Sequence, residues 1–415
     1  MSRDNVSTRW GLLSTLRQHG LAKSAKLLVV NVILSVALVL PVFIFLGARA
    51  EERVVLTADK SPWLRFYDDP STSMVVSWET SEMSNSYVLY GESSTSLDMI
   101  AADASMVLVH HVYLSGLSQN TRYYYRAGHN STGTPVLGAT FSFMTAPVNV
   151  TAPFTFLAIS DTQESTLGIN HHAVVADGLA REARLGARFT LHAGDVADSG
   201  TDQDEWNYYW KHAATYSASL PILPAIGNHD DHGSQPMFRK YFAFRAPGEP
   251  LYYSFNYSSL LHVTALKITY GRETDFTSPG GMAMMGFLAA DLAAAASMPF
   301  KIVYFHCPII SSGFFGVNQV VMDNIRPFLA QYNVTVVITG HDHHYERLIM
   351  DSTTHLVIGG GGGVLDPCHN VLQETRAVTS IPHYARFTID PAQGMSFEAC
   401  TPQGNVFDAA FFPLP

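Results

Sequence analysis

Five apolar stretches between residues 152 and 341 each end in a side chain of the kind that binds metal ions. These side chains are Asp161, Asp195, Asn228, His306 and His341, and His343 follows two residues after the last. The separations are 34, 33 and 35 residues for Asp161–Asp195, Asp195–Asn228 and His306–His341, which is the length of one strand plus one crossover helix. Open α/β sheets bind their ligands at the edge where the carboxyl ends of such strands meet. The sequence therefore predicts an α/β domain that gathers six donor side chains at one edge.

The rest of residues 152–415 agrees with a largely parallel core. Strand-like segments such as "PFTFLAISD" and "FKIVYFH" alternate with helix-like segments such as "HHAVVADGLAREARLG" and "QVVMDNIRPFLAQY". The last apolar segments, "THLVIGG", "HYARFTID", "MSFEACTP" and "NVFDAAFF", predict further strands in a second sheet.

The donor types favour a site for two metal ions. Any one of the six side chains alone is more often a polar loop or core residue, but six at regular spacing are a strong signal. Two carboxylates, one amide oxygen and three imidazoles suit Mn, Fe or Zn. One carboxylate can bridge two ions, and two ions ~3.5–4 Å apart can hold both the attacking and the leaving oxygen of a phosphoryl transfer.

Residues 61–147 predict a separate all-β domain. Short alternating segments, among them "SMVVSWET", "NSYVLYGE" and "TFSFMTAP", are separated by Ser, Gly, Asn and Pro, which is typical of a small β-sandwich. The segment "LSQNTRYYYRAG" resembles fibronectin type III-like domains. His110 and His111 lie in one predicted strand and are interpreted as ordinary strand residues that face the next domain.

The N-terminus predicts a membrane anchor. Residues 27–48 form an apolar stretch long enough to cross a bilayer as a helix. Residues 1–26 carry five basic side chains and one acidic side chain, so they are expected to stay in the cytoplasm while everything after the span is translocated. The segment "ARA" at 48–50 leaves a cleaved signal peptide as the alternative. Residues 49–60 are a predicted linker. The protein is thus expected to be single-pass membrane-bound, or secreted after cleavage.

Charge and cysteine content exclude two other classes of protein. The chain has a net charge of −10 although its first 26 residues are basic, so no nucleic-acid-binding surface is expected. Three cysteines predict free buried thiols rather than a disulfide scaffold. Four N-x-S/T sequons lie past the apolar stretch 27–48, at Asn130, Asn149, Asn256 and Asn333, and are candidate glycan sites in a eukaryotic host.

The strand-end motifs resemble a known superfamily. "ISDTQ", "GDVADSG", "GNHD", "YFHCP" and "GHDHH" are similar to the signature of the calcineurin-like metallophosphoesterases. With "GHDHHYER" at 340–347 and the fibronectin-like domain, the nearest resemblance is to purple acid phosphatases, over residues 61–415. The resemblance implies a four-layer αββα metallophosphoesterase core.

The resemblance also implies roles for the donor residues. Asp195 would bridge two metal ions (Fe, Zn or Mn), Asp161 and His343 would complete one site, and Asn228, His306 and His341 would form the other. His229 would contact phosphate and protonate the leaving oxygen, oriented by Asp198. The implied reaction is hydrolysis of phosphomonoesters by a metal-bound hydroxide.

Two departures from the family pattern matter. Purple acid phosphatases have a metal-binding tyrosine where this chain has Asp198, so a colourless enzyme is expected, with an Asp198–His229 dyad as the acid. Many superfamily members have a ligating histidine where this chain has Gln163, which leaves a metal-binding, water-holding or structural role open for that side chain.

Three further features have competing interpretations. The glycine run 359–363 lacks the Gly-Lys-Ser/Thr ending of a phosphate-binding loop, so close packing beside the metal edge is favoured. His344 and Arg347 are candidates for substrate contact, with a structural Glu346–Arg347 ion pair as the alternative. Cys307 beside His306 is interpreted as a packed core thiol rather than a nucleophile.

The sequence thus predicts a metal-dependent phosphatase whose partner is a small phosphorylated substrate. A phosphodiesterase or nucleotide hydrolase on the same core is the nearest alternative. A catalytically inactive surface binding protein is an alternative of a different class. The expected membrane association runs through the N-terminal helix, and a homodimer is among the oligomeric states left open.

Overall fold

The computed structural model describes residues 60–415 except 131–133, 165–169, 245–247, 270–274 and 369. The chain divides into two compact units, Met1–Val54 and Val55–Pro415, and every described residue belongs to the second. The predicted N-terminus (1–26), the predicted membrane segment (27–48) and all but the last residue of the predicted linker lie outside the described residues. Within the part of the chain that is described, no helix is both long and apolar enough to cross a membrane.

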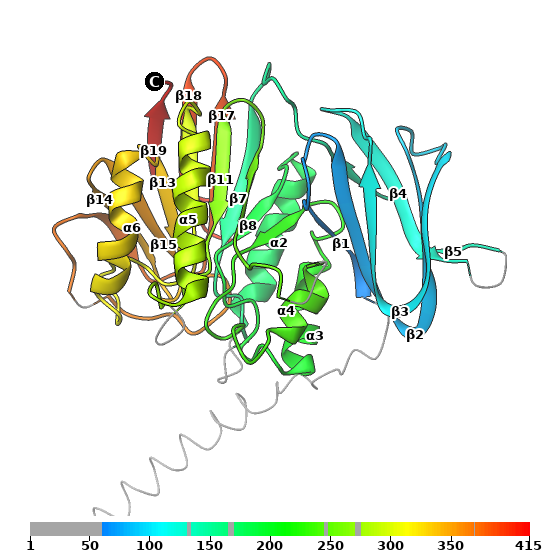
Figure 1. Ribbon diagram of the computed structural model, residues 1–415, viewed down its shortest axis with the longest axis horizontal. Helices are drawn as coiled ribbons and strands as arrows, with labels where there is room; N and C mark the ends of the chain where they lie inside the picture. Colours follow the sequence, from blue (N-terminus) through cyan, green and yellow to red (C-terminus); the bar gives the residue numbers. More distant parts are fainter. Residues whose placement is uncertain (1–59, 131–133, 165–169, 245–247, 270–274, 369) are drawn as a thin grey trace, which may run out of the picture. The chain divides into compact units, whose positions relative to one another are not determined.

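The described chain begins with an all-β domain, as predicted (Figure 1). Its six strands form one hydrogen-bonded antiparallel sheet: β1 (Lys60–Arg65), β2 (Ser73–Gly91), β3 (Met99–Ser115), β4 (Arg122–His129), β5 (Val136–Leu137) and β6 (Phe141–Met144). The segments "SMVVSWET" and "NSYVLYGE", predicted as two strands, form the single strand β2. Strand β3 pairs with β2 on both sides of an irregular step between Glu79 and Ser84, so the polar segment there bulges without ending the strand.

The β domain packs against the following domain through aromatic and main-chain contacts. The rings of Trp63 and Trp210 lie 4.3 Å apart, and the hydroxyl of Tyr125 donates to the carbonyl of Ala218 at 2.8 Å. His111 faces the next domain as predicted, since its Nε2 contacts the carbonyl of Lys240 at 2.9 Å. These buried contacts fix the β domain to the core that carries the candidate site.

The core contains two mixed sheets. The first has the order β19-β18-β17-β7-β8-β9, with β7, β8 and β9 parallel to one another. Its strands are β7 (Phe154–Ile159), β8 (Thr190–His192), β9 (Ile222–Pro224), β17 (Tyr384–Asp390), β18 (Gly394–Cys400) and β19 (Val406–Pro413).

The second sheet has the order β10-β11-β12-β13-β15-β14-β16, and β11, β12, β13 and β15 are parallel. Its strands are β10 (Tyr253–Asn256), β11 (Leu261–Ala265), β12 (Phe300–Tyr304), β13 (Val336–Thr339), β14 (Tyr345–Met350), β15 (Thr353–Ile358) and β16 (Thr375–Thr379). No strand was predicted from the sequence for the segments that form β10 and β11.

The described residues of the core form five helices: α2 (His171–Arg184), α3 (Gln203–Ala213), α4 (Pro236–Tyr241), α5 (Pro279–Ala294) and α6 (Gln319–Gln331). A polar side chain caps the first turn of four of them, because it accepts a main-chain N–H that has no partner inside the helix. The caps are Asn170 for α2, Asp202 for α3, Ser278 for α5 and Asn318 for α6.

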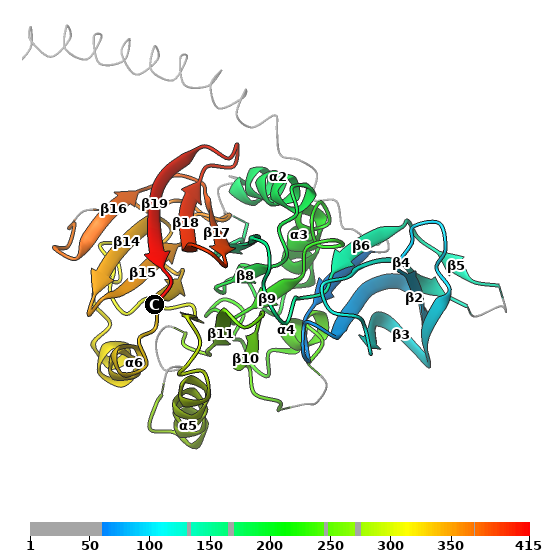
Figure 2. The same ribbon diagram turned by 90° about the horizontal axis from the view of Figure 1, so that it is seen from above.

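Side-chain alternation along the strands produces four layers. In β7, Phe156 faces the apolar core between the two sheets, whereas Leu157 packs with the α2 and α3 side chains. In β12, Ile302 faces the intersheet core, whereas Val303 packs with α5 and α6. Figure 2 shows the resulting order of helices, sheet, sheet and helices. The predicted αββα core is therefore confirmed.

One topological prediction was wrong. The last four apolar segments do not form a second sheet of their own. The segment "THLVIGG" contributes β15 beside β13, and the remaining three become β17, β18 and β19, which extend the sheet of β7. Their alternating pattern predicts strands correctly, but it does not indicate with which strand of which sheet each of them pairs.

Candidate metal centre

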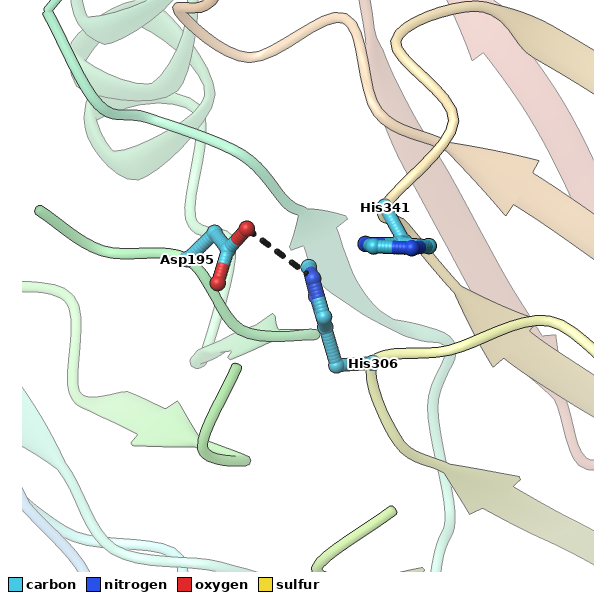
Figure 3. Close-up of side chains that lie close together, drawn as sticks. All are labelled: Asp195, His306 and His341. Atoms are coloured by element: carbon cyan, nitrogen blue, oxygen red, sulfur yellow. Dashed lines mark ion pairs between the residues drawn. The ribbon is translucent and has the colours of Figure 1, made fainter. Parts of the chain in front are cut away.

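The candidate site lies where strands of both sheets end. Asp161, Asp195 and Asn228 follow β7, β8 and β9 of the first sheet, while His306 and the pair His341 and His343 follow β12 and β13 of the second. The structure thus brings together the carboxyl ends of two facing sheets rather than of one. Asp195, His306 and His341 come closest, with one donor atom of each within 4.8 Å of the others. Figure 3 shows the Asp195 carboxylate directed at the His306 ring, with the His341 ring beside it.

Three donor residues have a left-handed backbone. Asp161, Asp195 and His341 have φ values of 57°, 52° and 70°, a region that non-glycine residues rarely adopt. Each such residue costs of order 1–3 kcal/mol and persists only where the surroundings enforce it. Here the left-handed residue turns the chain sharply just beyond the strand end.

Close main-chain packing enforces these turns. The N–H of His341 donates to both carboxylate oxygens of Asp161, at 3.0 and 3.1 Å. A Cβ on Gly340 would lie 2.1 Å from Asp161 Oδ2, and a Cβ on Gly227 would lie 2.1 Å from Asp195 Oδ1. The glycines of "GNHD" and "GHDHH" are therefore required because the backbone passes directly against the donor carboxylates.

His306 connects the two carboxylates. Its Nε2 lies 3.0 Å from Asp195 Oδ2 and 4.0 Å from Asp161 Oδ1, and its Nδ1 donates to the carbonyl of Ala193 at 3.0 Å. That main-chain contact fixes the ring orientation and directs Nε2 into the site, as is usual for a metal-binding imidazole.

His343 forms a second group with Asp161 and Gln163. His343 Nε2 lies 3.5 Å from Asp161 Oδ1 and 3.2 Å from the amide nitrogen of Gln163, while its Nδ1 donates to the carbonyl of Val364 at 2.7 Å. The amide oxygen of Gln163 is buried without a hydrogen-bond partner among the described residues. Gln163 thus lies within reach of the predicted second site.

The buried charges are strongly coupled. Burial alone would lower the pKa of His306, but the carboxylates of Asp195 and Asp161 outweigh burial and raise it to about 9. Burial, and then the charge of His306, lower the pKa of His341 to about 3. Burial opposes ionisation of Asp195, yet His306 holds the pKa of that carboxyl below its usual range. Asp195 is therefore an anion at neutral pH, as a metal-binding carboxylate must be.

The residues present fit a pair of metal ions. Asn228 Oδ1 is buried and has no hydrogen-bond partner within the described chain, although leaving a buried acceptor unsatisfied costs about 1–3 kcal/mol. It lines the same cleft as Asp195, His341 and His343. An amide oxygen, two carboxylates and three imidazoles directed into one space form a donor set for borderline transition metals.

A cleft of about 510 Å³ opens onto these donors. Asp195, Asn228, His229, His341 and His343 line its polar part, so a small ligand in the cleft would touch both predicted metal groups.

Two parts of the chain match known families. Residues 154–345 match the calcineurin-like phosphoesterases, and residues 61–145 match the purple acid phosphatase N-terminal domain. The chain joins a calcineurin-like phosphoesterase domain to a purple acid phosphatase N-terminal domain. The resemblance predicted from the motifs is therefore confirmed. Enzymes of this family use a dinuclear metal centre.

Relatives and solved structures agree. An uncharacterized protein of Mycobacterium tuberculosis is 28% identical over 367 residues, which cover 72% of this chain and 68% of that one. Purple acid phosphatase 23 of Arabidopsis thaliana is 26% identical over 297 residues, covering 62% of this chain and 63% of the relative, so the match spans less than two thirds of that protein. The structure of purple acid phosphatase PPD1 from yellow lupin (Lupinus luteus) shares the fold, with a TM-score of 0.73 and 16% identity over 86% of this chain and 74% of that one.

His229 of the phosphoesterase domain lies at the edge of the donor group. Its Nε2 is 4.0 Å from Asp195 Oδ2, and its side chain is 39% exposed and lines the cleft. Burial lowers its pKa, but Asp195 and Asp198 outweigh burial and raise it. The contact between Asp198 and His229 differs from the predicted dyad, in which the Asp198 carboxylate orients the ring. His229 Nδ1 lies 2.6 Å from the main-chain carbonyl of Asp198 and 3.5 Å from its carboxylate, so the main chain is the direct hydrogen-bond partner.

Asp230 is a site residue that the sequence analysis missed. Its buried carboxylate accepts the N–H groups of Gly227, Val196 and Ala197, at distances between 3.0 and 3.3 Å. It thereby ties the loop that carries Asp195 to the loop that carries Asn228. Burial, and then the charge of Asp195, raise its pKa to about 7. The one available signal was its place in "GNHD", directly after two candidate site residues.

The structure contradicts the predicted substrate contacts of His344 and Arg347. The His344 ring is fully buried and its Nε2 lies 3.3 Å from Glu346, whose carboxylate also accepts the N–H of Ser312 at 2.7 Å. Arg347 forms a two-pronged ion pair with Asp408 on β19, at 2.7 and 2.8 Å. Neither side chain lines the cleft. The alternative Glu346–Arg347 pair is also wrong, because consecutive strand residues point to opposite faces of the sheet.

The packing interpretations of the glycine run and of Cys307 are confirmed. A Cβ on Gly361 would lie 2.2 Å from the carbonyl of Ser160, and one on Gly363 would lie 2.6 Å from the ring of His343. The run therefore supports the main chain beside the phosphoesterase site. Cys307 is free and buried, and burial raises its pKa to about 11, which is unsuited to a thiolate nucleophile.

Proposed function

We propose that this chain is a metal-dependent phosphatase that hydrolyses phosphomonoesters. The observation that carries the proposal is the convergence of donor atoms from Asp195, His306 and His341 within 4.8 Å, beside a cleft that His229 also lines. The family match supports a metallophosphoesterase, and the relatives named as purple acid phosphatases favour monoesters.

The donor groups divide into two predicted metal positions. Asn228, His306 and His341 would hold one ion, Asp161 and His343 the other, with Asp195 between them and Gln163 at the side of the second. A bound pair of ions would supply positive charge to the phosphoryl oxygens and lower the pKa of a bound water. The protein contributes donors whose positions are fixed by the backbone around them.

His229 is the proposed acid. Its Nδ1 donates to the carbonyl of Asp198, which fixes the tautomer and leaves Nε2 to face the cleft. In the protonated ring Nε2 carries a proton that it can donate to the leaving oxygen. Because the pKa of His229 is raised, the protonated form persists to higher pH than in a free imidazole, and it is lost as the pH rises through that raised value. The acid-dependent rate should therefore fall on the alkaline side.

A pair of substrates tests the proposal. The purified full-length protein, stripped with a chelator and reloaded with Mn, Fe or Zn, is expected to hydrolyse 4-nitrophenyl phosphate at least about tenfold faster than bis(4-nitrophenyl) phosphate. Chelation should abolish both reactions, and metal analysis of the reloaded protein should find two ions per chain. With Asp198 in place of a metal-binding tyrosine, the iron-loaded protein should be colourless in the visible range.

The opposite outcomes support the alternatives. Preference for the diester would favour a phosphodiesterase on the same core. A folded protein that hydrolyses neither substrate with any of the three metals would favour an inactive binding protein.

We also propose that the phosphatase domain lies outside the cytosol, because basic residues precede the apolar stretch 27–48 and an acidic chain follows it. A protease added to intact cells is expected to remove the phosphatase domain, or the domain will already be in the medium if the signal is cleaved. Protection until the cells are permeabilised would contradict this orientation.

A further inference from the structure

The cleft is lined by two chemically different groups of residues. The polar group is made of metal-site residues and His229. The apolar group is Phe314, Phe315, Val364 and Pro367, from the loop before α6 and the loop after β15. A phosphate held at the donors would therefore direct its ester group along an apolar wall.

The loop that carries the two phenylalanines is held in place at both ends. The N–H of Ser311 donates to the carbonyl of Gly316 at 2.9 Å, and Ile310 and Val317 form an isolated antiparallel bridge. The N–H of Phe315 donates to Asp342 Oδ1 at 3.3 Å. A Cβ on Gly313 would lie 2.5 Å from the carboxyl carbon of Asp342, so the loop passes directly against the "GHDHH" segment.

In this loop, the Phe315 ring is packed against the site, whereas the Phe314 ring is exposed to solvent. The Phe315 ring packs on the ring of His341, with 3.8 Å between centroids. Phe314 meets Phe315 edge-on at 5.2 Å, and 86% of its surface remains exposed. Phe314 is thus a large apolar surface, fixed by its loop, at the rim of a polar site. When an apolar ligand group covers this ring, the burial of apolar surface and the ring stacking both contribute favourably to the binding free energy.

The charges of the cleft favour a ligand with a single phosphate. Among the described residues that line it, none is lysine or arginine. Asp366, two residues after Val364, also lines the cleft, and its carboxylate accepts the N–H of His343 at 3.1 Å. A second phosphate or a carboxylate on the ester group would lie near this acid without a cationic partner.

We propose that the cleft selects phosphomonoesters whose alcohol part is aromatic or otherwise apolar and carries no further negative charge, with Phe314 as the surface on which that part stacks. This inference rests on the proposed phosphatase function and names its substrate class. Phe314 is a specificity-determining residue in this view, so it acts on KM more than on kcat.

The test compares 2-phenylethyl phosphate with ethyl phosphate, because both release a simple alcohol and differ mainly in the ring. For the metal-loaded full-length protein, Phe314→Ala is expected to raise KM for 2-phenylethyl phosphate about tenfold and to leave ethyl phosphate within about twofold. Phe314→Tyr should retain the preference. The matched control is Phe411→Ala. Phe411 is 56% exposed on β19 and does not line the cleft, so its removal should leave KM unchanged for both substrates.

Calorimetric binding of 2-phenylethylphosphonate and ethylphosphonate separates this inference from the proposed function, since neither ligand has to be hydrolysed. Tighter binding of the phenylethyl compound that is lost in Phe314→Ala would support the cleft assignment even if both esters resisted hydrolysis, in which case only the phosphatase proposal fails. Equal binding of the two phosphonates by the unmodified protein, or an equal loss for both in Phe314→Ala, would overturn the inference. A lower KM for 4-carboxybenzyl phosphate than for benzyl phosphate would also overturn it.

Discussion

Asp195→Asn is expected to lower kcat for a phosphomonoester by about 10³-fold or more and to remove at least one metal ion from the protein. Asp195 lies 3.0 Å from His306 and accepts the main-chain N–H of His229 at 2.9 Å, so it connects both sheets with the loop of the proposed acid. The amide keeps the shape but removes the charge that would hold two cations together. Activity assays and metal analysis of the same preparation measure both effects.

The control for this variant is Asp177→Asn, an exposed position on α2 away from the cleft, which should retain metal and activity. Urea unfolding of both variants shows whether the folded state survives. An Asp195→Asn protein that keeps two metal ions and more than about a tenth of its activity would show that Asp195 is not the bridging donor.

His229→Ala is expected to lower kcat by about 10²–10³-fold while metal content stays unchanged, because His229 is proposed to donate a proton and not to bind a metal ion. The loss should be greatest for alkyl phosphates, whose leaving oxygen needs the proton, and smallest for 4-nitrophenyl phosphate. The decline of activity as the pH rises through the raised pKa of His229 should disappear in the variant. Steady-state kinetics against pH with the two substrate types provide the measurement.

Asp198→Asn refines this prediction, because the side chain changes while the main-chain carbonyl that holds His229 Nδ1 remains. We expect a loss of only a fewfold, far less than for His229→Ala. The control is His232→Ala. His232 is exposed and does not line the cleft, so this variant should have the activity of the unmodified protein. A loss in Asp198→Asn as large as that in His229→Ala would instead assign the main effect to the carboxylate.

The strand ends were the part of the site that the sequence could predict. Apolar runs that end in Asp, Asn or His at constant spacing follow from βα geometry, and this placed Asp161, Asp195 and Asn228 at one edge. His306 and His341 come from the other sheet, and no spacing argument could show that the two sheets face each other with these edges aligned. That alignment depends on packing between residues such as Phe156 and Ile302, which are remote in the chain.

The wrong and missed assignments depend on contacts that the local sequence does not encode. His344 directly follows His343, and Arg347 lies four residues after His343, in β14, yet neither lines the cleft, so proximity in the chain does not imply proximity to the site. The partner of Arg347 is Asp408, 61 residues further on, and local pattern could not indicate it. Asp230 was missed because its carboxylate binds main-chain N–H groups. Every residue except proline has such a group, so the side chains of its partners give no signal in the sequence.

The left-handed conformations of Asp161, Asp195 and His341 have an evolutionary consequence. Glycine and asparagine tolerate these dihedral angles better than the residues present, so the local conformational preference and the chemistry favour different amino acids at the same three places. A laboratory lineage selected only for resistance to heat would tend to accumulate the more tolerant residues there and would lose turnover as it gained thermal endurance.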